Sequence, residues 1–592
     1  MCRTSDHNTS NDLGEDNVCS VDKCAPWSFD ESSVLKIDHD IEGGIKKSSY
    51  ETSNYSTPSE VCEELSQLMR NAVPLIVAGL LLYPRGIISM YFLGRLGELE
   101  LAGGALSIAF ANITGYSVLY GLALGMEPIC GQAYGAKQWS LMMITTKRAM
   151  VGLMCASFPI AILWLNMQKI LLLCRQDESV TQMASIYILY SIPDLAVQCV
   201  LHPLRIYLRS QNITIPISCC AGIALPLHVL ANVLLVNVLH LGIRGVALAA
   251  VCTNVNMLLF LIAYLKYSKK VYMKGMWSSW SSLFSKQDWA PLIKLAIPSC
   301  VSVCLEWWWY ELMIMLSGLL VEAKATVATM GILIQITALV YIFPSSLSLA
   351  VSTRVSNELG ANRPAKARLA VMVASCCAVL LGIIAMAFTT TIRHTWGRMF
   401  TNDETILRLT AMALPIIGLC ELGNSPQTTG CGVLRGSARP SVGVKINLAC
   451  FYVIGMPVAI ILVFGLGYGF VGLWLGLLAA QATCAVSMML VMLRTNWLQE
   501  AERSKGLTKA SGGIGGLRTE ESERVEEGTK EGMVKKGDDE ERMACTVQIK
   551  QEDEEKRGLL EDKEQEHEEA PGDCEHDEGE KSNSISKRSP KA

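Results

Sequence analysis

Residues 369–392 read LAVMVASCCAVLLGIIAMAFTTTI, a run without a single charged side chain. A helix of about 20 apolar residues crosses the hydrocarbon core of a bilayer. Similar runs recur along the chain, and the charged residues gather near its two ends. Hydrophobic residues make up 51% of the sequence and charged residues 18%, an unusual balance for a soluble protein. The sequence predicts an all-α, multi-pass membrane protein with twelve spanning helices, at 73–94, 101–125, 147–173, 181–204, 213–239, 245–267, 291–320, 326–350, 369–392, 405–431, 441–465 and 470–493.

The same pattern divides the chain into five parts. Two lobes of six helices, 71–267 and 291–495, are joined by a polar loop at 268–290. The polar N-terminal region 1–70 and the charged tail 496–592 have no pattern that could bury a core, so both are predicted to be disordered. Ser584, Ser586 and Ser589 lie among basic residues of the tail and are candidate sites for a regulatory kinase.

Lys and Arg are distributed unevenly between the connections of the predicted spans. With a cytoplasmic N-terminus, the inner connections carry many more of them than the outer ones, which offer only Arg95, Lys169, Arg175, Arg244, Lys324, Arg393 and Arg398. Cytoplasmic connections of membrane proteins are enriched in these residues. Both termini are therefore predicted to be cytoplasmic.

The two lobes share short motifs at a nearly constant offset. The matched positions are Pro74 and Pro298, Gly135 and Gly360, Arg209 and Arg435, and Gly242 and Gly467. A repeat with an even number of spans gives parallel halves related by a pseudo-twofold axis along the membrane normal. In such an arrangement a substrate binds between the lobes, and access alternates between the two sides.

Motifs for several other classes of protein are absent from the sequence. It contains no phosphate-binding G-x-x-x-x-G-K-[ST] loop and no H-E-x-x-H or G-x-S-x-G motif. The 8 His and 21 Cys show no metal-ligand spacing. We expect no enzymatic activity, no metal or other cofactor, and no nucleic-acid partner. A small organic solute and membrane lipid are the expected partners.

Charged residues inside a span are costly and are candidates for function. The seventh span contains Glu306 and Glu311, whose separation of five residues turns them about 140° apart on a helix. Only one can face a given cavity. Glu306 lies deeper, with Tyr310 one turn away on the same face. Burial disfavours a charged carboxyl, so Glu306 is a candidate proton-coupling group; the alternative is a simple bond to a neighbouring helix, which is the favoured interpretation for Glu311.

The tenth span carries a polar stripe made of Glu421, Asn424, Ser425 and Thr428. Their spacing places them on one face of a helix that Pro426 must distort. Such a stripe lines either a water-filled cavity or a contact with partner helices. Gln335 and Tyr341 of the eighth span are further candidates for the cavity lining, with ordinary packing as the alternative.

In the first lobe, Arg85 is expected to pair with a carboxylate or to serve an anionic substrate. Asp194 follows Pro193 and is expected to satisfy backbone groups that this proline leaves open. His202 and His228 are interpreted as packing residues.

Four motifs of this chain resemble the multidrug and toxic compound extrusion (MATE) family of plants over residues 72–495. They are Gly131-Gln-Ala-Tyr-Gly-Ala136, Cys304-Leu-Glu-Trp-Trp308, Ser352-Thr-Arg-Val-Ser-Asn-Glu-Leu-Gly-Ala361 and Leu434-Arg-Gly-Ser-Ala-Arg-Pro440. The resemblance implies a proton-coupled antiporter whose coupling carboxylates lie in the second lobe, at Glu306 and Glu421. The run Pro426–Leu434 resembles a subclade linked to hormone and organ-growth phenotypes. That subclade resides in the plasma membrane or in endomembranes such as the Golgi, late endosome or vacuole.

The sequence departs from the family pattern in the first span. Archaeal and many bacterial relatives carry an acid late in that helix, where this chain has Ile87-Ile-Ser89. The expected function is export of a small organic solute in exchange for protons. Sodium coupling is the first alternative, because Glu421 and nearby oxygens also suit a hard cation; a channel or a membrane receptor is a further one.

Overall fold

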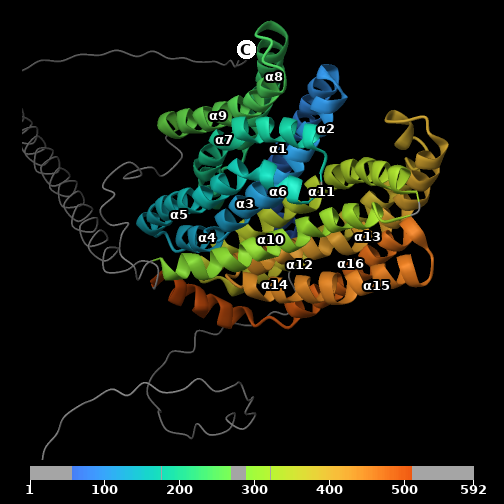
Figure 1. Cartoon of the computed structure of the whole chain (residues 1–592). Helices are drawn as coiled ribbons and strands as arrows, with labels where there is room; N and C mark the ends of the chain where they lie inside the picture. The colour runs from blue at the N-terminus through green and yellow to red at the C-terminus, as the bar shows by residue number, and fades with distance from the viewer. Residues whose placement is uncertain (1–56, 175, 269–288, 321, 510–592) are drawn as a thin grey trace, which may run out of the picture. The chain divides into compact units, whose positions relative to one another are not determined.

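The spanning helices of the chain are seen in a computed structural model that describes residues 57–174, 176–268, 289–320 and 322–509 (Figure 1). Within these residues the secondary structure is helical, with no strand, and twelve helices are long and apolar enough to cross a membrane. The prediction of twelve spans is confirmed.

The first lobe holds six of these spans. They are α1 (Pro58–Leu96), the segment formed by α2 (Glu98–Ala111), η1 (Asn112–Tyr116), α3 (Ser117–Leu124) and α4 (Glu127–Gly135), then α5 (Trp139–Leu165), α7 (Glu178–Ser210), α8 (Ile215–Asn232) with η2 (Val233–Val238), and α9 (Ile243–Tyr267). A short helix, α6 (Met167–Leu173), follows α5. Helix α7 packs against α2, α5 and α9, and α8 packs against α1 and α9.

The second lobe holds the other six. They are α10 (Ala290–Ser317), α11 (Ala323–Gly360), α12 (Pro364–Thr391), α13 (Glu404–Gly436), the segment formed by α14 (Pro440–Asn447), η6 (Leu448–Gly455), α15 (Met456–Ile460) and η7 (Ile461–Gly465), and α16 (Gly469–Leu493). A single turn, η5 (Gly397–Met399), precedes α13. Helix α13 is central, because it packs against α11, α12 and α16.

Backbone conformation repeats between the lobes as the sequence motifs do. Positive φ angles occur at matched positions: Lys137 and Asn362 (59° and 57°), Asn212 and Ala438 (58° each), and Gly242 and Gly467 (57° and 72°). Residues other than Gly rarely adopt this conformation. Its recurrence at one offset shows that the two lobes share the same connections between their helices.

The start of α1 and the end of α16 lie on one face of the protein, which we call the terminal face. A single apolar cluster there contains Leu68 of α1, Leu359 of α11, Ala367 of α12 and Met492 of α16. The opposite ends of the same helices form the opposite face.

Two predicted boundaries were wrong at the terminal face. Helix α1 begins at Pro58, inside the region 1–70 that was predicted to be disordered, because a capping box pairs Thr57 with Glu60. Residues 497–509 are also helical, inside the predicted disordered tail 496–592. The remaining residues of both predicted regions, the loop 269–288 and the three tail serines lie outside the described residues.

The helix at 497–509 packs one face against the lobes. Trp497, Ala501, Ser504 and Thr508 are buried at helical spacing, whereas Leu498 is 73% exposed. Glu500 pairs with Arg439 of the α13–α14 connection at 3.2 Å. Burial lowers the pKa of the Arg439 guanidinium, and Glu500 opposes this shift by favouring the charged form. The helix is thus held by apolar packing and by a largely buried ion pair.

Replacing the buried tryptophan tests this packing. Trp497→Ala is expected to lower the free energy of unfolding by about 3 kcal/mol, because a large buried aromatic side chain is lost. Leu498→Ala, one residue away on the exposed face, is expected to change it by less than about 0.5 kcal/mol. Thermal unfolding of the purified protein in detergent measures both, and equal effects would show that the helix does not pack as described.

Candidate functional site

Three of the four predicted stripe residues of α13 form one hydrogen-bonded chain. Glu421 is 2% exposed and accepts a hydrogen bond from Asn424 Nδ2 at 2.9 Å. Asn424 Oδ1 in turn accepts from Thr428 Oγ1 at 3.3 Å and from Gln481 Nε2 of α16 at 3.4 Å. Ser425, the fourth stripe residue, is buried beside them, and its hydroxyl has no hydrogen-bond partner among the described residues.

Close helix packing places Glu421 inside the lobe. A Cβ atom on Gly382 of α12 would lie 2.9 Å from the Glu421 carbonyl oxygen, and one on Gly423 would lie 2.7 Å from the carbonyl of Gln481 in α16. Real Cβ contacts are essentially never this short, so glycine is required at both crossings. The backbone of α13 therefore approaches both neighbours, and the Glu421 carboxyl has little access to solvent.

Glu306 of α10 belongs to the same polar region. Its partly exposed side chain lies next to Tyr341 of α11 and Gln427 of α13, and close enough to Glu421 for the two carboxyls to interact electrostatically. Tyr310, one turn further along α10, also faces both carboxyls. The structure thus brings together Glu306, Tyr310, Tyr341 and the Glu421 stripe.

Two predicted residues lie elsewhere. Glu311 is partly exposed and forms no hydrogen bond or ion pair with any described residue. Gln335 is exposed, and its side chain forms no hydrogen bond or ion pair with the residues that the structure describes; its backbone carbonyl accepts from the Tyr83 hydroxyl of the first lobe at 3.0 Å.

Sequence reasoning missed the polar partners contributed by other helices. Gln427 Nε2 donates to Asn447 Oδ1 at 3.3 Å, and Asn447 Nδ2 donates to Ser302 Oγ of α10 at 3.3 Å. Gln481 was missed in the same way. The available signal for Asn447 and Gln481 was the single amide in each of the spans 441–465 and 470–493, whereas Gln427 directly follows Pro426 beside the predicted stripe. Within the described residues, no group of three or more His, Cys, Asp or Glu side chains could hold a metal ion.

Asp194 of α7, in the first lobe, forms hydrogen bonds with neighbouring amide side chains. Asp194 accepts hydrogen bonds from Asn254 Nδ2 at 2.8 Å and from Gln198 Nε2 at 3.2 Å. The Asn254 amide oxygen accepts from Arg85 Nη1 at 2.7 Å, so the amide connects the cation to the acid. The bonds are to side chains, not to the backbone near Pro193 as expected. His228 is buried, with its ring nitrogens 2.7 Å from Thr253 Oγ1 and 3.2 Å from Ser89 Oγ, as expected for a packing residue.

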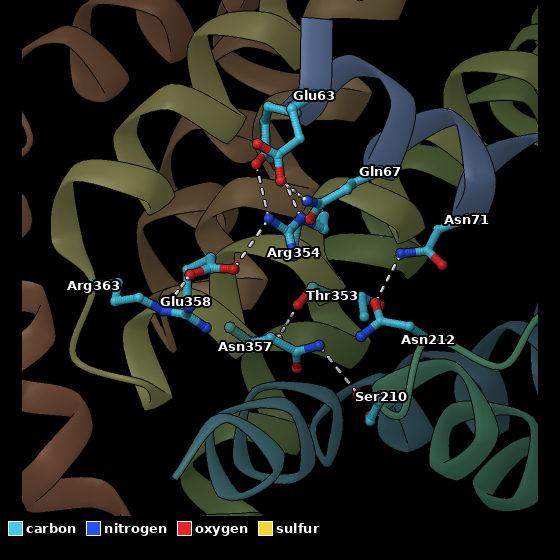
Figure 2. A network of polar contacts seen from close by, with 12 residues as sticks. Glu63, Gln67, Asn71, Ser210, Asn212, Thr353, Arg354, Asn357, Glu358 and Arg363 are labelled. Carbon is cyan, nitrogen blue, oxygen red and sulfur yellow. Dashed lines mark hydrogen bonds and ion pairs between the residues drawn. The ribbon is translucent and has the colours of Figure 1, made fainter. Parts of the chain in front are cut away.

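At the terminal face, a buried ion pair joins the two lobes. Arg354 of α11 donates from Nε and Nη2 to the two carboxylate oxygens of Glu64 in α1, at 2.9 and 2.8 Å. Figure 2 shows Arg354 also facing Glu358, which in turn contacts Arg363; the ion-pair distances are 3.0 and 2.8 Å. Both Glu64 and Arg354 are buried.

A second buried carboxylate connects the lobes near the same face. Glu127 of α4 lies 3.0 Å from Arg209 of α7 and 3.5 Å from Arg435 of α13. The two arginines are matched positions of the repeat, one from each lobe. A single acid therefore bridges a symmetric pair of cations between the lobes.

Hydrogen bonds across the lobes obey the same symmetry. Gln132 Nε2 donates to the Gly436 carbonyl at 3.1 Å, and Asn357 Nδ2 donates to the Ser210 carbonyl at 3.2 Å (Figure 2). Each donor and each acceptor occupies the position that matches its counterpart in the other lobe. Such reciprocal contacts are expected where two similar halves meet around a twofold axis.

Glycines allow α4 and α11 to cross at this place. A Cβ on Gly135 would clash with the Asn357 carbonyl oxygen, and one on Gly360 would clash with the Gln132 carbonyl oxygen. A Cβ on Gly131 would clash with Ser356 Oγ. The lobes are in direct backbone contact here, and the terminal face is closed.

The comparisons with known proteins agree with this organisation. A model of the MatE family matches residues 74–234 and 298–461, one stretch in each lobe, beginning at the matched prolines. Two Arabidopsis thaliana proteins, Protein DETOXIFICATION 48 and Protein DETOXIFICATION 49, are 56% and 57% identical to this chain. The alignments cover 77% and 76% of this chain and 85% and 90% of those proteins.

Solved structures give the same result. The crystal structure of the eukaryotic MATE transporter AtDTX14 superimposes with a TM-score of 0.72 at 31% identity, over 76% of this chain and 100% of that one. The Vibrio cholerae MATE transporter VcmN in the bent form shares the fold with a TM-score of 0.65 at 17% identity, over 75% of this chain and 99% of that one.

Removing one member of the buried ion pair is expected to loosen the terminal face. Glu64→Gln should lower the free energy of unfolding by about 3 kcal/mol, because Arg354 loses its bidentate partner while it stays buried. Backbone amides at the ends of α4 and α11 should then exchange hydrogen faster. Glu63→Gln changes an exposed neighbour that contacts only Gln67, and is the matched control. Unchanged exchange in Glu64→Gln would contradict the role of the pair in closing this face.

A methyl group at the helix crossing is expected to separate the lobes there. Gly360→Ala should cost about 2 kcal/mol of stability, because its Cβ meets backbone atoms that cannot rotate away. Gly331→Ala, in the same helix with open space around it, should instead be neutral or stabilising by up to about 1 kcal/mol. Thermal unfolding of the two variants decides this point; equal effects would show that the crossing tolerates a side chain.

Proposed function

Because this chain belongs to the MatE family, whose members are membrane transporters, we propose that it exports small organic solutes in exchange for protons. The observation that supports proton coupling is the pair of neighbouring carboxyls, Glu306 and Glu421, inside the second lobe. Neither forms an ion pair with a basic residue in the described part of the chain. Glu421 is buried, whereas Glu306 is partly exposed and feels Arg435 electrostatically without an ion pair. A buried acid without an ion-pair partner can exchange a proton under physiological conditions.

The proposed mechanism alternates access between the two faces. In the present structure the α4–α11 contact and the ion pairs around it close the terminal face. A solute bound between the lobes would then leave by the opposite face. Separation of the buried pairs Glu64–Arg354 and Glu127–Arg435 would open the terminal face to the next solute. The open and closed states must be similar in free energy for the cycle to turn over.

Coupling follows from competition at the second-lobe carboxyls. When Glu306 and Glu421 are charged, they attract a cationic or hydrogen-bonding solute into the polar region. Protonation removes that charge and weakens the acceptor that Asn424 uses in Glu421. The solute is thus released as protons bind. Each proton that moves down its gradient supplies about 1.4 kcal/mol per pH unit and about 2.3 kcal/mol per 100 mV of membrane potential.

Orientation is part of the same proposal. The excess of Lys and Arg on connections at the terminal face favours a cytoplasmic position for that face and for both termini. Transport would then run from the cytosol across the plasma membrane or into an endomembrane compartment such as the Golgi, late endosome or vacuole. The word detoxification in the names of the relatives supports outward transport of organic molecules.

Sodium is the second candidate for the coupling ion. Ser425 leaves a buried hydroxyl without a partner among the described residues, next to the Glu421–Asn424 pair, and these oxygens are ligands that a hard cation accepts. Vesicles that contain the purified protein separate the two cases. With a panel of amphipathic organic molecules as test solutes, a proton antiporter responds to an imposed pH gradient without sodium, and a sodium antiporter does not.

The central test of proton coupling is the removal of the α10 acid. Glu306→Gln is expected to abolish export driven by a pH gradient, a loss of at least about 100-fold in rate, while the protein still inserts and folds. Glu311→Gln removes the acid that has no polar partner among the described residues and is expected to retain transport. Full transport by Glu306→Gln would eliminate Glu306 as a coupling residue.

The two lobes are expected to respond differently to loss of an acid. Glu421→Gln should shift the pH dependence of solute exchange, because a proton couples to the solute only where its site lies against the solute. Asp194→Asn should leave that dependence largely intact, since Asp194 is held by Asn254 and Gln198. A pH titration of exchange in both variants is the measurement; the opposite pattern would place coupling in the first lobe.

A further inference from the structure

At the opposite face of the second lobe, basic side chains surround a hollow that the transport proposal does not use. The hollow has a volume of about 510 Å³ and lies between the end of α12 and the start of α13. Its lining is Arg393, His394, Arg398, Leu407, Arg408, Ala411, Met412 and Pro415. Three arginines and a histidine therefore face one space, above an apolar floor formed by α13.

The segment that carries three of these side chains is fixed in place. Trp396 Nε1 donates to the carbonyl of Ile332 in α11 at 3.2 Å. A Cβ on Gly397 would lie 2.9 Å from Leu407 Cδ2, so the turn packs directly on α13. Arg393 Nε also lies 3.0 Å from His394 Nε2. The backbone of the turn is thus held by packing at Trp396 and Gly397, and the exposed side chains of Arg393 and Arg398 extend from it into the lining of the hollow.

The positive charge of the hollow is not neutralised by nearby acids. Among the described residues, Arg393, Arg398 and Arg408 form no ion pair. The nearest acids along the chain are Asp403 and Glu404. Asp403 is engaged in capping α13, where it accepts from the backbone amides of Thr405 and Ile406 at 2.9 and 3.1 Å. Guanidinium groups without acidic partners favour phosphate, which they bind through paired hydrogen bonds.

Apolar side chains beside the hollow indicate how such a phosphate would arrive. Met399 and Phe400 follow Arg398 and are 71% and 50% exposed, and Met412 in the floor is 43% exposed. Phe388 and Leu419 continue this exposed apolar surface along α12 and α13. A soluble anion gains nothing from these side chains, whereas acyl chains lie against such a surface when a headgroup sits above it.

We propose that this hollow binds a phosphate group presented by an anionic membrane lipid, with Arg393, Arg398 and Arg408 around the phosphate and the acyl chains along α12 and α13. The site stands apart from the carboxyls of the second lobe. Binding there would fasten the α12–α13 connection to the membrane surface. The hollow lies at the face opposite the proposed cytoplasmic one, so the lipid would belong to the outer or lumenal leaflet, where guanidinium groups bind its phosphate through paired hydrogen bonds.

Lipid binding to the purified full-length protein tests the proposal. Delipidated protein in detergent is titrated with fluorescent phosphatidic acid, with phosphatidylcholine and inorganic phosphate as separate competitors. We expect phosphatidic acid to bind and neither competitor to displace it efficiently. Arg393→Gln, Arg398→Gln and Arg408→Gln together should weaken binding by about tenfold or more, because two or more charge-assisted hydrogen bonds are lost.

Controls separate this site from general basicity. Arg244→Gln removes an arginine at the start of α9, in the first lobe, where the Arg244 side chain stacks on Tyr190. This variant should leave binding unchanged. Arg398→Gln alone changes one residue of the turn and keeps the test valid if the triple variant unfolds. Wild-type affinity in the triple variant would overturn the proposal, and so would wild-type affinity in Arg398→Gln if the triple variant does not fold. Displacement by inorganic phosphate at equal concentration would overturn the lipid source and assign the site to a soluble anion.

Discussion

The crossing of α4 and α11 is the constraint on which the arrangement of the two lobes depends. Gly131 and Ser356 are matched positions of the repeat, and they face each other directly across the lobe interface. Two matched residues can touch only at the pseudo-twofold axis. The axis inferred from the sequence repeat thus passes through a physical contact, and Gly135 and Gly360 extend that contact on both sides. Their missing side chains let backbone meet backbone.

The proposed transport cycle requires this contact to open, and the charges buried around the crossing favour that. A fully apolar contact between the lobes would be hard to open, because it gains from exclusion of water. Buried ion pairs are different: their mutual attraction is offset in large part by the cost of removing both charges from water. Glu127 and Glu64 each bind arginine across the interface, so separation of the lobes returns those groups to water and recovers part of that cost. The interface can then be closed firmly in one state and open in another.

Much of this organisation could be predicted from the sequence, because apolar runs and repeated motifs are local signals. The twelve spans follow from apolar runs, and the two lobes follow from the repeated motifs. The Glu421–Asn424–Thr428 row follows from spacing along one helix. The partners Gln481, Asn447 and Gln427 could not be assigned, since they meet only when α10, α13, α14 and α16 pack together. The helix at 497–509 was missed for another reason. Its charged residues dominate the composition, and its buried face has small or polar side chains, Ser504 and Thr508 among them, that carry no hydropathy signal.

The lobes share a scaffold but differ in how they treat buried charge. In the first lobe, Asp194 is joined to Arg85 through the Asn254 amide, so a cation is fixed one amide away from the acid. In the second lobe, Glu306 and Glu421 lie near each other with amides and tyrosines around them, and neither forms an ion pair with a described residue. The duplicated fold thus surrounds its buried acids differently in the two halves, in agreement with the proposal that protons bind in the second lobe. What distinguishes the halves at these acids is the set of neighbouring side chains, which the shared backbone of the repeat does not fix.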